Sequence, residues 1–266
     1  MLTINDAPPA SPTPEPVAAV RRAPARPMNW GDWLAERLSP GFFSGMGLGT
    51  WLQVLWDNGF AIDPPYWPRA ALITLASVPN SLTAALESFA FGPAVRRARI
   101  APPLFVLGLP RSGTTHLHNL LARDDRFSFP NSFEMLFPHT FLAADFLLRR
   151  LVGRLMTPTR PQDAVKSGID EPQEDEWAFP AMMGQSPLLG SAFPRQADRH
   201  QRYLTLRDVG EHQRERWKQA LRALVQKLSY RHGGRPLVLK SPGHTGRIGL
   251  LLDLFPDARF VHIRRN

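Results

Sequence analysis

Apolar residues in the second half of the chain follow two alternating patterns. Short apolar runs at residues 104–107 and 237–239 predict buried strands, and residues 259–263, which contain Phe260, Val261 and Ile263, predict a third strand. Between the runs, apolar residues recur three and four positions apart. This spacing predicts helices, including a long one over residues 208–230 that ends at two consecutive glycines. Strands alternating with helices predict an α/β fold with a parallel sheet flanked by helices, so residues 101–266 read as one α/β domain.

The first half of the chain has a different composition. Residues 1–28 are rich in proline and alanine and predict a disordered or extended leader, because they can bury little apolar surface. Residues 29–100 are rich in tryptophan and phenylalanine and predict a helical N-terminal region. Their least polar window, residues 70–90, is interrupted and falls short of the roughly 18 to 20 apolar residues that cross a bilayer. Peripheral membrane contact through exposed aromatic side chains is the alternative to a purely structural region.

Three helices are expected within this region. They cover residues 51–57, 67–77 and 81–89. Thr50 with Gln53 three positions later has the pattern of a capping box, which places the start of the first helix.

Composition narrows the classes of function. The chain has 266 residues, 43% of them hydrophobic, which is enough for a substantial core. Its net charge of +9 suits an acidic ligand, but its basic residues are spread out and lack a nucleic-acid recognition motif. The absence of cysteine excludes disulfides and thiolate metal sites. No signal peptide is recognisable, which favours a cytoplasmic protein.

The stretch with the clearest chemistry is Gly-Leu-Pro-Arg-Ser-Gly-Thr-Thr at residues 108–115, between the first strand and a helix. Glycines let the backbone approach an anion, and the helix N-terminus presents its N–H groups to it. A nucleotide-hydrolysing P-loop carries a lysine after its second glycine. Thr114 holds that position here, and the cation is Arg111 inside the loop. An ATP- or GTP-dependent kinase or NTPase is therefore disfavoured.

Two further cations follow predicted strands. Lys240 comes directly after the second strand, and Arg265 after the third. The carboxyl ends of parallel strands share one edge of a sheet, and ligands of α/β proteins bind there. We therefore expect Arg111, Lys240 and Arg265 to converge.

The loop and a second block, Pro-Leu-Val-Leu-Lys-Ser-Pro-Gly-His at residues 236–244 with Phe-Val-His-Ile-Arg-Arg-Asn at 260–266, together resemble a known family. They are similar to sulfotransferases that use 3′-phosphoadenosine-5′-phosphosulfate (PAPS), close to the bacterial and tyrosylprotein-type branch. The resemblance covers residues 101–266 and implies a P-loop-like nucleotide-binding core. It also implies transfer of a sulfuryl group from PAPS to an acceptor hydroxyl, or to an amine as a weaker alternative, without a metal.

The resemblance also implies roles for individual residues. Arg111 would contact the 5′-phosphosulfate and take part in catalysis, while Lys240 would stabilise the sulfuryl group and the bridging oxygen. Arg265 would bind the 3′-phosphate, with Arg264 as the alternative. Four loop residues would supply further donors to the phosphosulfate: Ser112, Gly113, Thr114 and Thr115.

An attacking hydroxyl must lose its proton, and a positioned base typically contributes about 10²–10⁴-fold to such a step. The resemblance implies that Glu134 is this base, and His139 and His244 are the second candidates. His116 and His118 lie two positions apart on a predicted helix, so they point to different faces and do not share a metal.

An acidic run over residues 170–176 has two interpretations. It can bind substrate, or it can be the ordinary acidic first turn of a helix, which the helix dipole favours. The structural interpretation is preferred. Metalloprotease, serine-hydrolase and calcium-binding motifs are absent from the sequence, so no metal is expected.

The sequence therefore predicts a PAPS-dependent sulfotransferase, with a kinase or NTPase and a non-catalytic nucleotide-binding protein as alternatives. The acceptor is open among carbohydrate, peptide tyrosine, lipid and small alcohol. In the resembled family the chain continues beyond the position of Asn266 into a helix whose serine shares the 3′-phosphate. We therefore expect the α/β domain to be incomplete at its C-terminus, and residues 1–266 alone to bind PAPS weakly and transfer sulfate poorly.

Overall fold

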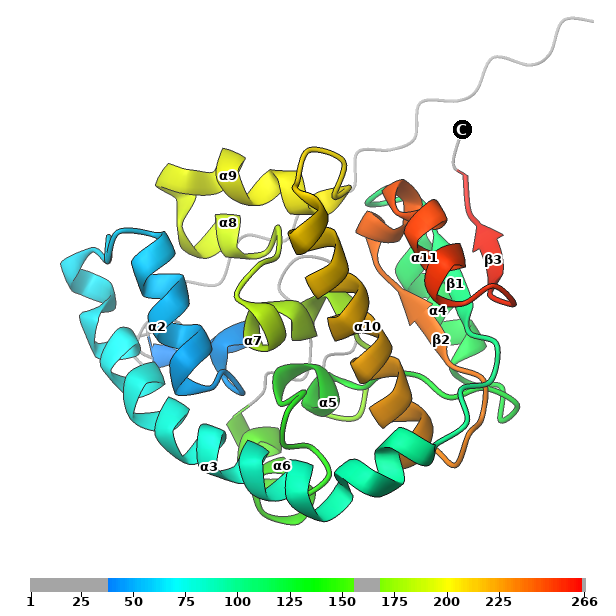
Figure 1. The fold of residues 1–266 in the computed structure, drawn as a ribbon, viewed down its shortest axis with the longest axis horizontal. Helices are drawn as coiled ribbons and strands as arrows, with labels where there is room; N and C mark the ends of the chain where they lie inside the picture. The colour runs from blue at the N-terminus through cyan, green and yellow to red at the C-terminus, as the bar shows by residue number, and fades with distance from the viewer. Residues whose placement is uncertain (1–37, 156–167, 265–266) are drawn as a thin grey trace, which may run out of the picture. The chain divides into compact units, whose positions relative to one another are not determined.

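The computed structural model of the chain describes residues 38–155 and 168–264, which belong to one compact unit, Arg37–Asn266 (Figure 1). The predicted leader, residues 1–28, and Arg265 lie outside the described residues.

A three-stranded parallel sheet forms the centre of the α/β part. Its strands are β1 (Leu104–Leu107), β2 (Val238–Lys240) and β3 (Arg259–His262), in the order β2-β1-β3. β1 lies in the middle and is buried over its last three residues. The α/β class and the parallel sheet are confirmed, and each predicted strand lies within one residue of its predicted position.

Helices flank this sheet. They are α4 (Thr114–Leu121), α10 (Glu211–Arg231) and α11 (Ile248–Leu254), with the 3₁₀ helix η6 (Pro242–Gly246) just after β2. On α10 the predicted apolar face is buried and joins the main hydrophobic cluster. The Gly234 N–H donates to the Ser229 carbonyl at 2.8 Å with φ of 76°, so the paired glycines end α10 as predicted.

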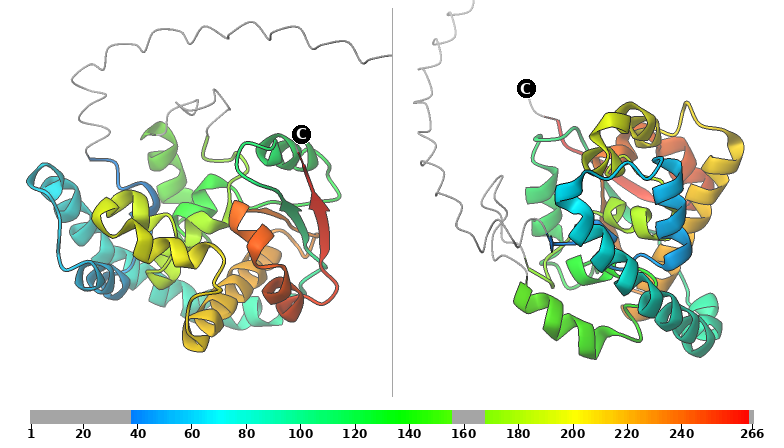
Figure 2. Two further views of the ribbon diagram at one scale, coloured as in Figure 1. Left: turned by 90° about the horizontal axis from the view of Figure 1, so that it is seen from above. Right: turned by 90° about the vertical axis from the view of Figure 1, so that its left-hand side faces the viewer.

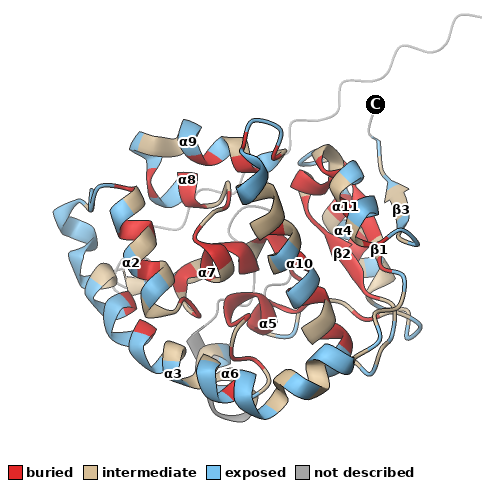
Figure 3. Ribbon diagram, viewed as in Figure 1, coloured by how far each residue is buried: buried red, intermediate tan, exposed pale blue. Residues whose placement is uncertain are grey.

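Short elements connect α4 to α10. They are α5 (Ser132–Leu136), α6 (Asp145–Leu155), η3 (Asp175–Ala178), α7 (Phe179–Met183), α8 (Leu189–Ala192), η4 (Pro194–Gln196), α9 (Ala197–Gln201) and η5 (Arg202–Leu204). Figure 3 shows that α5 and α7 are largely buried, so they form the centre of the helical part.

The first described elements are helical, as predicted: η1 (Gly41–Phe43), α2 (Leu48–Asp57), η2 (Pro64–Tyr66) and α3 (Trp67–Arg97). The predicted capping box is wrong. α2 begins three residues before the predicted start, with Gly47 in the extended N-cap position and no side-chain cap. Thr50 lies inside the first turn, where its helical backbone prevents it from acting as the cap.

The two helices predicted over residues 67–77 and 81–89 are one continuous helix, α3, which contains Pro79. Proline removes one helical hydrogen bond, here to the carbonyl of Leu75. Leu75 is exposed, so water can bind that carbonyl. The next residue, Asn80, donates through its side chain to the backbone carbonyls of residues 44 and 46 and ties this turn to the protein.

Helix α3 packs on the α/β part through a buried charge. Both the Leu142 and Ala143 N–H groups donate to one oxygen of Glu87 at 2.7 Å, and Lys227 of α10 pairs with the other oxygen. Burial lowers the pKa of Lys227, and the charge of Glu87 partly offsets this effect. α2 and the start of α3 lie on the opposite side of the unit from the sheet (Figure 2). Whether residues 29–100 and 101–266 are separate domains stays a prediction.

Candidate functional site

The loop after β1 begins at a position that only glycine fits. Gly108 has φ of 153°, and a Cβ there would lie 2.9 Å from the carbonyl oxygen of Ile263 and 2.8 Å from the hydroxyl of Ser112. Thr245 of η6 holds this residue from the side, because its Oγ1 accepts from the Gly108 N–H at 3.0 Å. The loop start is therefore fixed by β1, η6 and the chain just after β3 at once.

The middle of the loop carries Arg111 outward. Its φ of 67° places it in the left-handed region, which costs an L-residue about 1–2 kcal/mol, and its side chain is exposed. Ser112 stabilises the turn, because its N–H and its hydroxyl both donate to the Leu109 carbonyl, at 3.2 and 2.8 Å. Loops that bind ligands often contain a strained backbone conformation that hydrogen bonds of this kind hold in place.

Helix α4 begins directly behind the loop and presents its N-terminus to it. Gly113 is the N-cap, with φ of 104° and no capping side chain. The first N–H groups of a helix have no intrahelical partner, and they carry the positive end of the helix dipole. The first turn of α4, at Thr114 and Thr115, is therefore available to an anion.

Lys240 reaches this first turn from the neighbouring strand. It is the last residue of β2 and pairs in register with Val106 of β1. Its Nζ donates to Thr115 Oγ1 at 3.3 Å. β3 ends close by, with Arg264 exposed just beyond it. The structure thus brings Lys240 and the loop together at the carboxyl ends of the strands.

Sequence reasoning missed the carboxylate that contacts this lysine. Glu174 Oε1 lies 2.5 Å from Lys240 Nζ. The lysine side chain is only 2% exposed, whereas that of Glu174 is 22% exposed, so Glu174 is the member of the pair that solvent and ligands can reach. Glu174 belongs to the acidic run over residues 170–176, but the run itself does not show which carboxylate faces the loop.

The next two acidic residues have structural partners. Asp175 accepts from His244 Nε2 at 2.7 Å, with both side chains fully buried, and Glu176 pairs with Arg247 at 2.7 Å. Three consecutive carboxylates therefore join η3 to the segment from Lys240 to Arg247. For Asp175 and Glu176, the structural interpretation of the acidic run over residues 170–176 therefore holds. His244, one of the candidate bases, is the buried partner of Asp175.

Electrostatics stabilises the Asp175 carboxylate. Burial by itself would raise its pKa, but His244 and Arg247 outweigh burial and hold the pKa below the ordinary value of 3.8. A lowered folded-state pKa means that this stabilisation is present above about pH 4. It is lost as the pH falls through the folded-state pKa.

Replacing Asp175 by Asn is expected to lower the free energy of unfolding by about 3–5 kcal/mol, because it removes one partner of a buried pair. Urea unfolding between pH 3 and pH 8 measures this, and the difference from the parent should shrink at the acid end. Asp253→Asn is the control, because Asp253 forms an exposed pair with Lys218 worth at most about 1 kcal/mol. Equal stability of parent and Asp175→Asn at neutral pH would contradict the assigned role.

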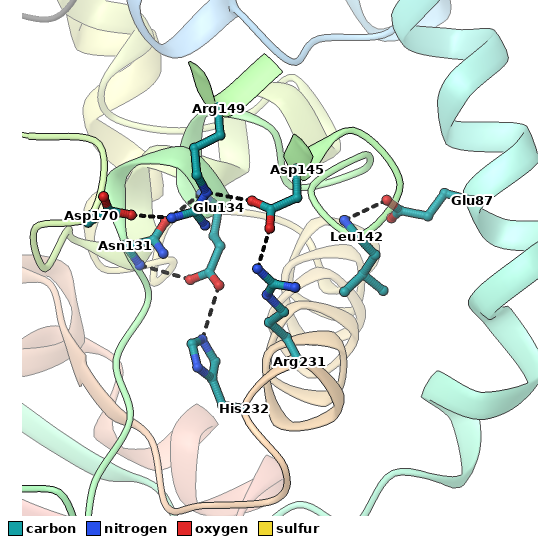
Figure 4. Close-up of polar contacts among 9 residues, drawn as sticks. All are labelled: Glu87, Asn131, Glu134, Leu142, Asp145, Arg149, Asp170, Arg231 and His232. Atoms are coloured by element: carbon teal, nitrogen blue, oxygen red, sulfur yellow. Dashed lines mark hydrogen bonds and ion pairs between the residues drawn. The ribbon is translucent and has the colours of Figure 1, made fainter. Parts of the chain in front are cut away.

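Glu134 occupies a different environment (Figure 4). It forms a complete capping box at the start of α5, because its Oε2 accepts from the Asn131 N–H at 2.9 Å and its own N–H donates to Asn131 Oδ1 at 3.0 Å. Its Oε1 lies 3.0 Å from Nε2 of His232, and the residue is buried. Oε2 is thus held by the α5 cap, whereas Oε1 lies near His232 without forming a hydrogen bond, and the role of Glu134 as the base stays a hypothesis.

The other histidines have separate surroundings. His139 is mostly buried, and burial lowers its pKa, so it is neutral near pH 7, with its Nε2 3.3 Å from the Ala181 carbonyl. His116 is exposed and His118 is buried, so they point to different faces of α4 as predicted. Within residues 38–155 and 168–264, no group of histidine and acidic side chains could hold a metal ion.

Comparison of the chain with known proteins identifies its family. A model of the sulfotransferase family matches residues 102–266, the part of the chain that holds the loop, Lys240 and the sheet. The chain belongs to the sulfotransferase family. The expectation from the two sequence blocks is thereby confirmed.

Curated relatives in this family come from mycobacteria. The omega-hydroxy-beta-dihydromenaquinone-9 sulfotransferases Stf3 of Mycobacterium bovis and Mycobacterium tuberculosis are each 35% identical to the chain over 246 residues. This alignment covers 92% of the chain and 62% of each relative, so the chain spans less than two thirds of the relatives' length.

Solved structures support the fold. The sulfotransferase STF1 from Mycobacterium tuberculosis H37Rv aligns with a TM-score of 0.52 at 19% identity, over 85% of this chain and 61% of that one. STF9 from Mycobacterium avium aligns with a TM-score of 0.51, also at 19% identity, over 84% and 63%. At this identity the likeness shows the P-loop-like α/β fold alone.

Proposed function

We propose that this protein is a PAPS-dependent sulfotransferase that moves a sulfuryl group to an acceptor hydroxyl. The observation that carries the proposal is the meeting of Lys240 with the first turn of α4, directly behind a glycine-hinged loop that holds Arg111 outward. Two cations and an uncapped helix N-terminus suit a polyanionic donor. Because Gly108 has no side chain, the backbone of the loop can approach a bound anion closely.

The chain's own residues would bind, orient and stabilise charge. Bound PAPS supplies an activated sulfuryl group and a leaving oxygen that becomes negative during transfer. Arg111 and the N–H groups of residues 112–115 would hold the phosphosulfate in position, and Lys240 would stabilise the charge on the bridging oxygen. Phosphoryl transfer is the nearest physical template, with Arg111 and Lys240 in place of a metal. Arg265, or Arg264 in its place, would bind the 3′-phosphate.

The acceptor hydroxyl must pass its proton to a base, and two carboxylates compete for this role. Glu134 is the residue that the family resemblance implies. Glu174 contacts Lys240 and is partly exposed, whereas Glu134 is buried, with one oxygen in the α5 cap and the other beside His232. The geometry therefore favours Glu174 as the base, because its carboxylate contacts Lys240 beside the loop and is partly exposed.

For the acceptor we propose a hydroxylated lipid. The name of the Stf3 relatives gives omega-hydroxy-beta-dihydromenaquinone-9, a hydroxylated menaquinone, as their substrate. A nucleic-acid partner is not proposed. The cytoplasm, where the donor is made, is the proposed location.

The kinase or NTPase alternative meets a structural obstacle. Thr114 occupies the position of the P-loop lysine and is buried as the first residue of α4. Calorimetric comparison of 3′,5′-adenosine bisphosphate with ATP plus magnesium tests the proposal, because a sulfotransferase binds the first more tightly and an NTPase the second. A non-catalytic nucleotide-binding protein would bind the bisphosphate but would not turn over PAPS.

Arg111→Ala is expected to weaken binding of 3′,5′-adenosine bisphosphate by about 10- to 100-fold, because each hydrogen bond to a charged group contributes about 1.5–3 kcal/mol. The melting temperature should stay the same, since Arg111 is exposed. Titration calorimetry measures the affinity. Arg126→Ala is the control, because Arg126 forms an exposed pair with Asp124. Unchanged affinity in a folded Arg111→Ala variant would rule out the proposed donor loop.

A further inference from the structure

Helix α3 turns its polar side chains toward the protein. The buried residues of α3 are the polar Ser77 and Glu87 and one apolar residue, Ile73, and Thr74 accepts from the indole N–H of Trp51 at 2.8 Å. Asn80 bonds to backbone carbonyls of the segment before α2. A surface helix in water normally has the reverse arrangement, with its apolar stripe inward.

The outer face of the same helix is apolar. Leu75, Leu82, Leu86 and Phe89 are 72%, 63%, 67% and 87% exposed. Their spacing of seven, four and three positions places them on one face, which we name the α3 stripe. Trp67, at the start of the helix, is also 61% exposed. Figure 3 shows the outer turns of α3 as exposed along much of its length.

The exposed charges on helix α3 and at its C-terminal end have one sign. The only carboxylate of α3 is Glu87, which is buried against Lys227. Exposed cations gather at the end of the helix, at Arg96 and Arg97 and just beyond at Arg99. An apolar face without exposed carboxylates and with cations at its end complements a surface of acyl chains and anionic headgroups. This charge pattern favours a membrane over a protein partner.

Only the outer face of helix α3 is free to contact such a surface. No helix of the described residues is long and apolar enough to span a membrane. The polar inner face of α3 is hydrogen-bonded to the rest of the protein, so only the α3 stripe can enter the apolar layer.

We propose that the α3 stripe binds the surface of a membrane that contains anionic lipids. The stripe supplies apolar area, and the basic end of α3 supplies attraction to the headgroups. This binding stands independently of the proposed reaction, and it would hold the enzyme at the layer where a hydroxylated lipid is found.

The test is flotation of the protein with vesicles of equal parts phosphatidylcholine and phosphatidylglycerol, and with vesicles of phosphatidylcholine alone. We expect binding to the mixed vesicles and several-fold weaker binding to the neutral ones. Leu82→Gln combined with Leu86→Gln should lower the partition coefficient by about tenfold or more. Ile248→Gln with Leu252→Gln is the matched control, because these residues are exposed on α11, and it should bind like the parent.

Three outcomes overturn the proposal: no flotation of the parent, equal losses in both double variants, or a parent dimer that Leu82→Gln with Leu86→Gln dissociates while vesicles stay unbound. The last outcome, seen by sedimentation, would identify the α3 stripe as an interface between copies.

Quenching of the parent's tryptophan fluorescence by brominated lipids supplies a readout that needs no variant of the stripe, because Trp67 lies beside it. Binding of 3′,5′-adenosine bisphosphate, measured in parallel, separates a failure here from a failure of the proposed reaction.

Discussion

Lys240→Met is expected to lower the rate of sulfuryl transfer by about 10²–10³-fold, the usual loss when one preorganised donor to a developing negative charge is removed. Lys240 Nζ lies at the first turn of α4, where the bridging oxygen would gain its charge. Methionine keeps the length and the apolar stem of the side chain, and Glu174 is partly exposed, so its freed carboxylate can be hydrated. The loss should therefore appear in kcat rather than in stability.

Single-turnover transfer of labelled sulfate measures this effect, in the longest form of the protein that its gene encodes. Lys218→Met is the control, because Lys218 pairs with Glu215 and Asp253 on the surface of α10 and α11. A Lys240→Met variant that is folded and transfers at the parental rate would remove Lys240 from the mechanism.

Glu174→Gln is expected to lower kcat by about 10²–10⁴-fold, because the amide keeps the shape of the carboxylate but cannot accept the proton. Donor affinity should stay near the parental value. A merely structural role of Glu174 would not separate kcat from donor affinity in this way. Rapid-quench kinetics measures kcat, and titration calorimetry measures donor affinity.

Glu134→Gln is the comparison that separates the two candidate bases. If Glu134 is only the cap of α5, its replacement should cost about 0.5–2 kcal/mol of stability and leave kcat within a few-fold of the parent. The reverse result, a large loss of kcat in Glu134→Gln and none in Glu174→Gln, would return the role of base to Glu134.

The sequence was most informative where function and local backbone geometry coincide. The loop at residues 108–115 was recognisable because glycines, a cation and hydroxyls must follow one another for the backbone to grip an anion. The strands and the buried face of α10 were predictable because burial imposes periodicity on the sequence. Lys240 could be placed beside the loop because parallel strands end at a common edge.

The parts that escaped prediction depend on contacts between distant segments. Pro79 does not break α3, because its neighbour Asn80 is tied to backbone carbonyls more than thirty positions earlier. Glu174 could not be singled out from its acidic neighbours, because only the packing of η3 against the segment after β2 assigns each carboxylate its cation. The outward orientation of the α3 stripe likewise follows from tertiary packing. The periodicity of the sequence defines an apolar face of a helix, but it does not show whether that face is buried or exposed.

We propose that the loop at residues 108–115 and Lys240 form a site for sulfuryl transfer to a hydroxylated lipid. The most direct measurement incubates the longest encoded form with labelled PAPS and vesicles that carry a menaquinone bearing a terminal hydroxyl. We expect labelled lipid sulfate and 3′,5′-adenosine bisphosphate in equal amounts, with the formation of both strongly reduced in Lys240→Met. Product formation that Lys240→Met leaves unchanged, or transfer of phosphate from ATP by the same protein in place of sulfate, would contradict this proposal.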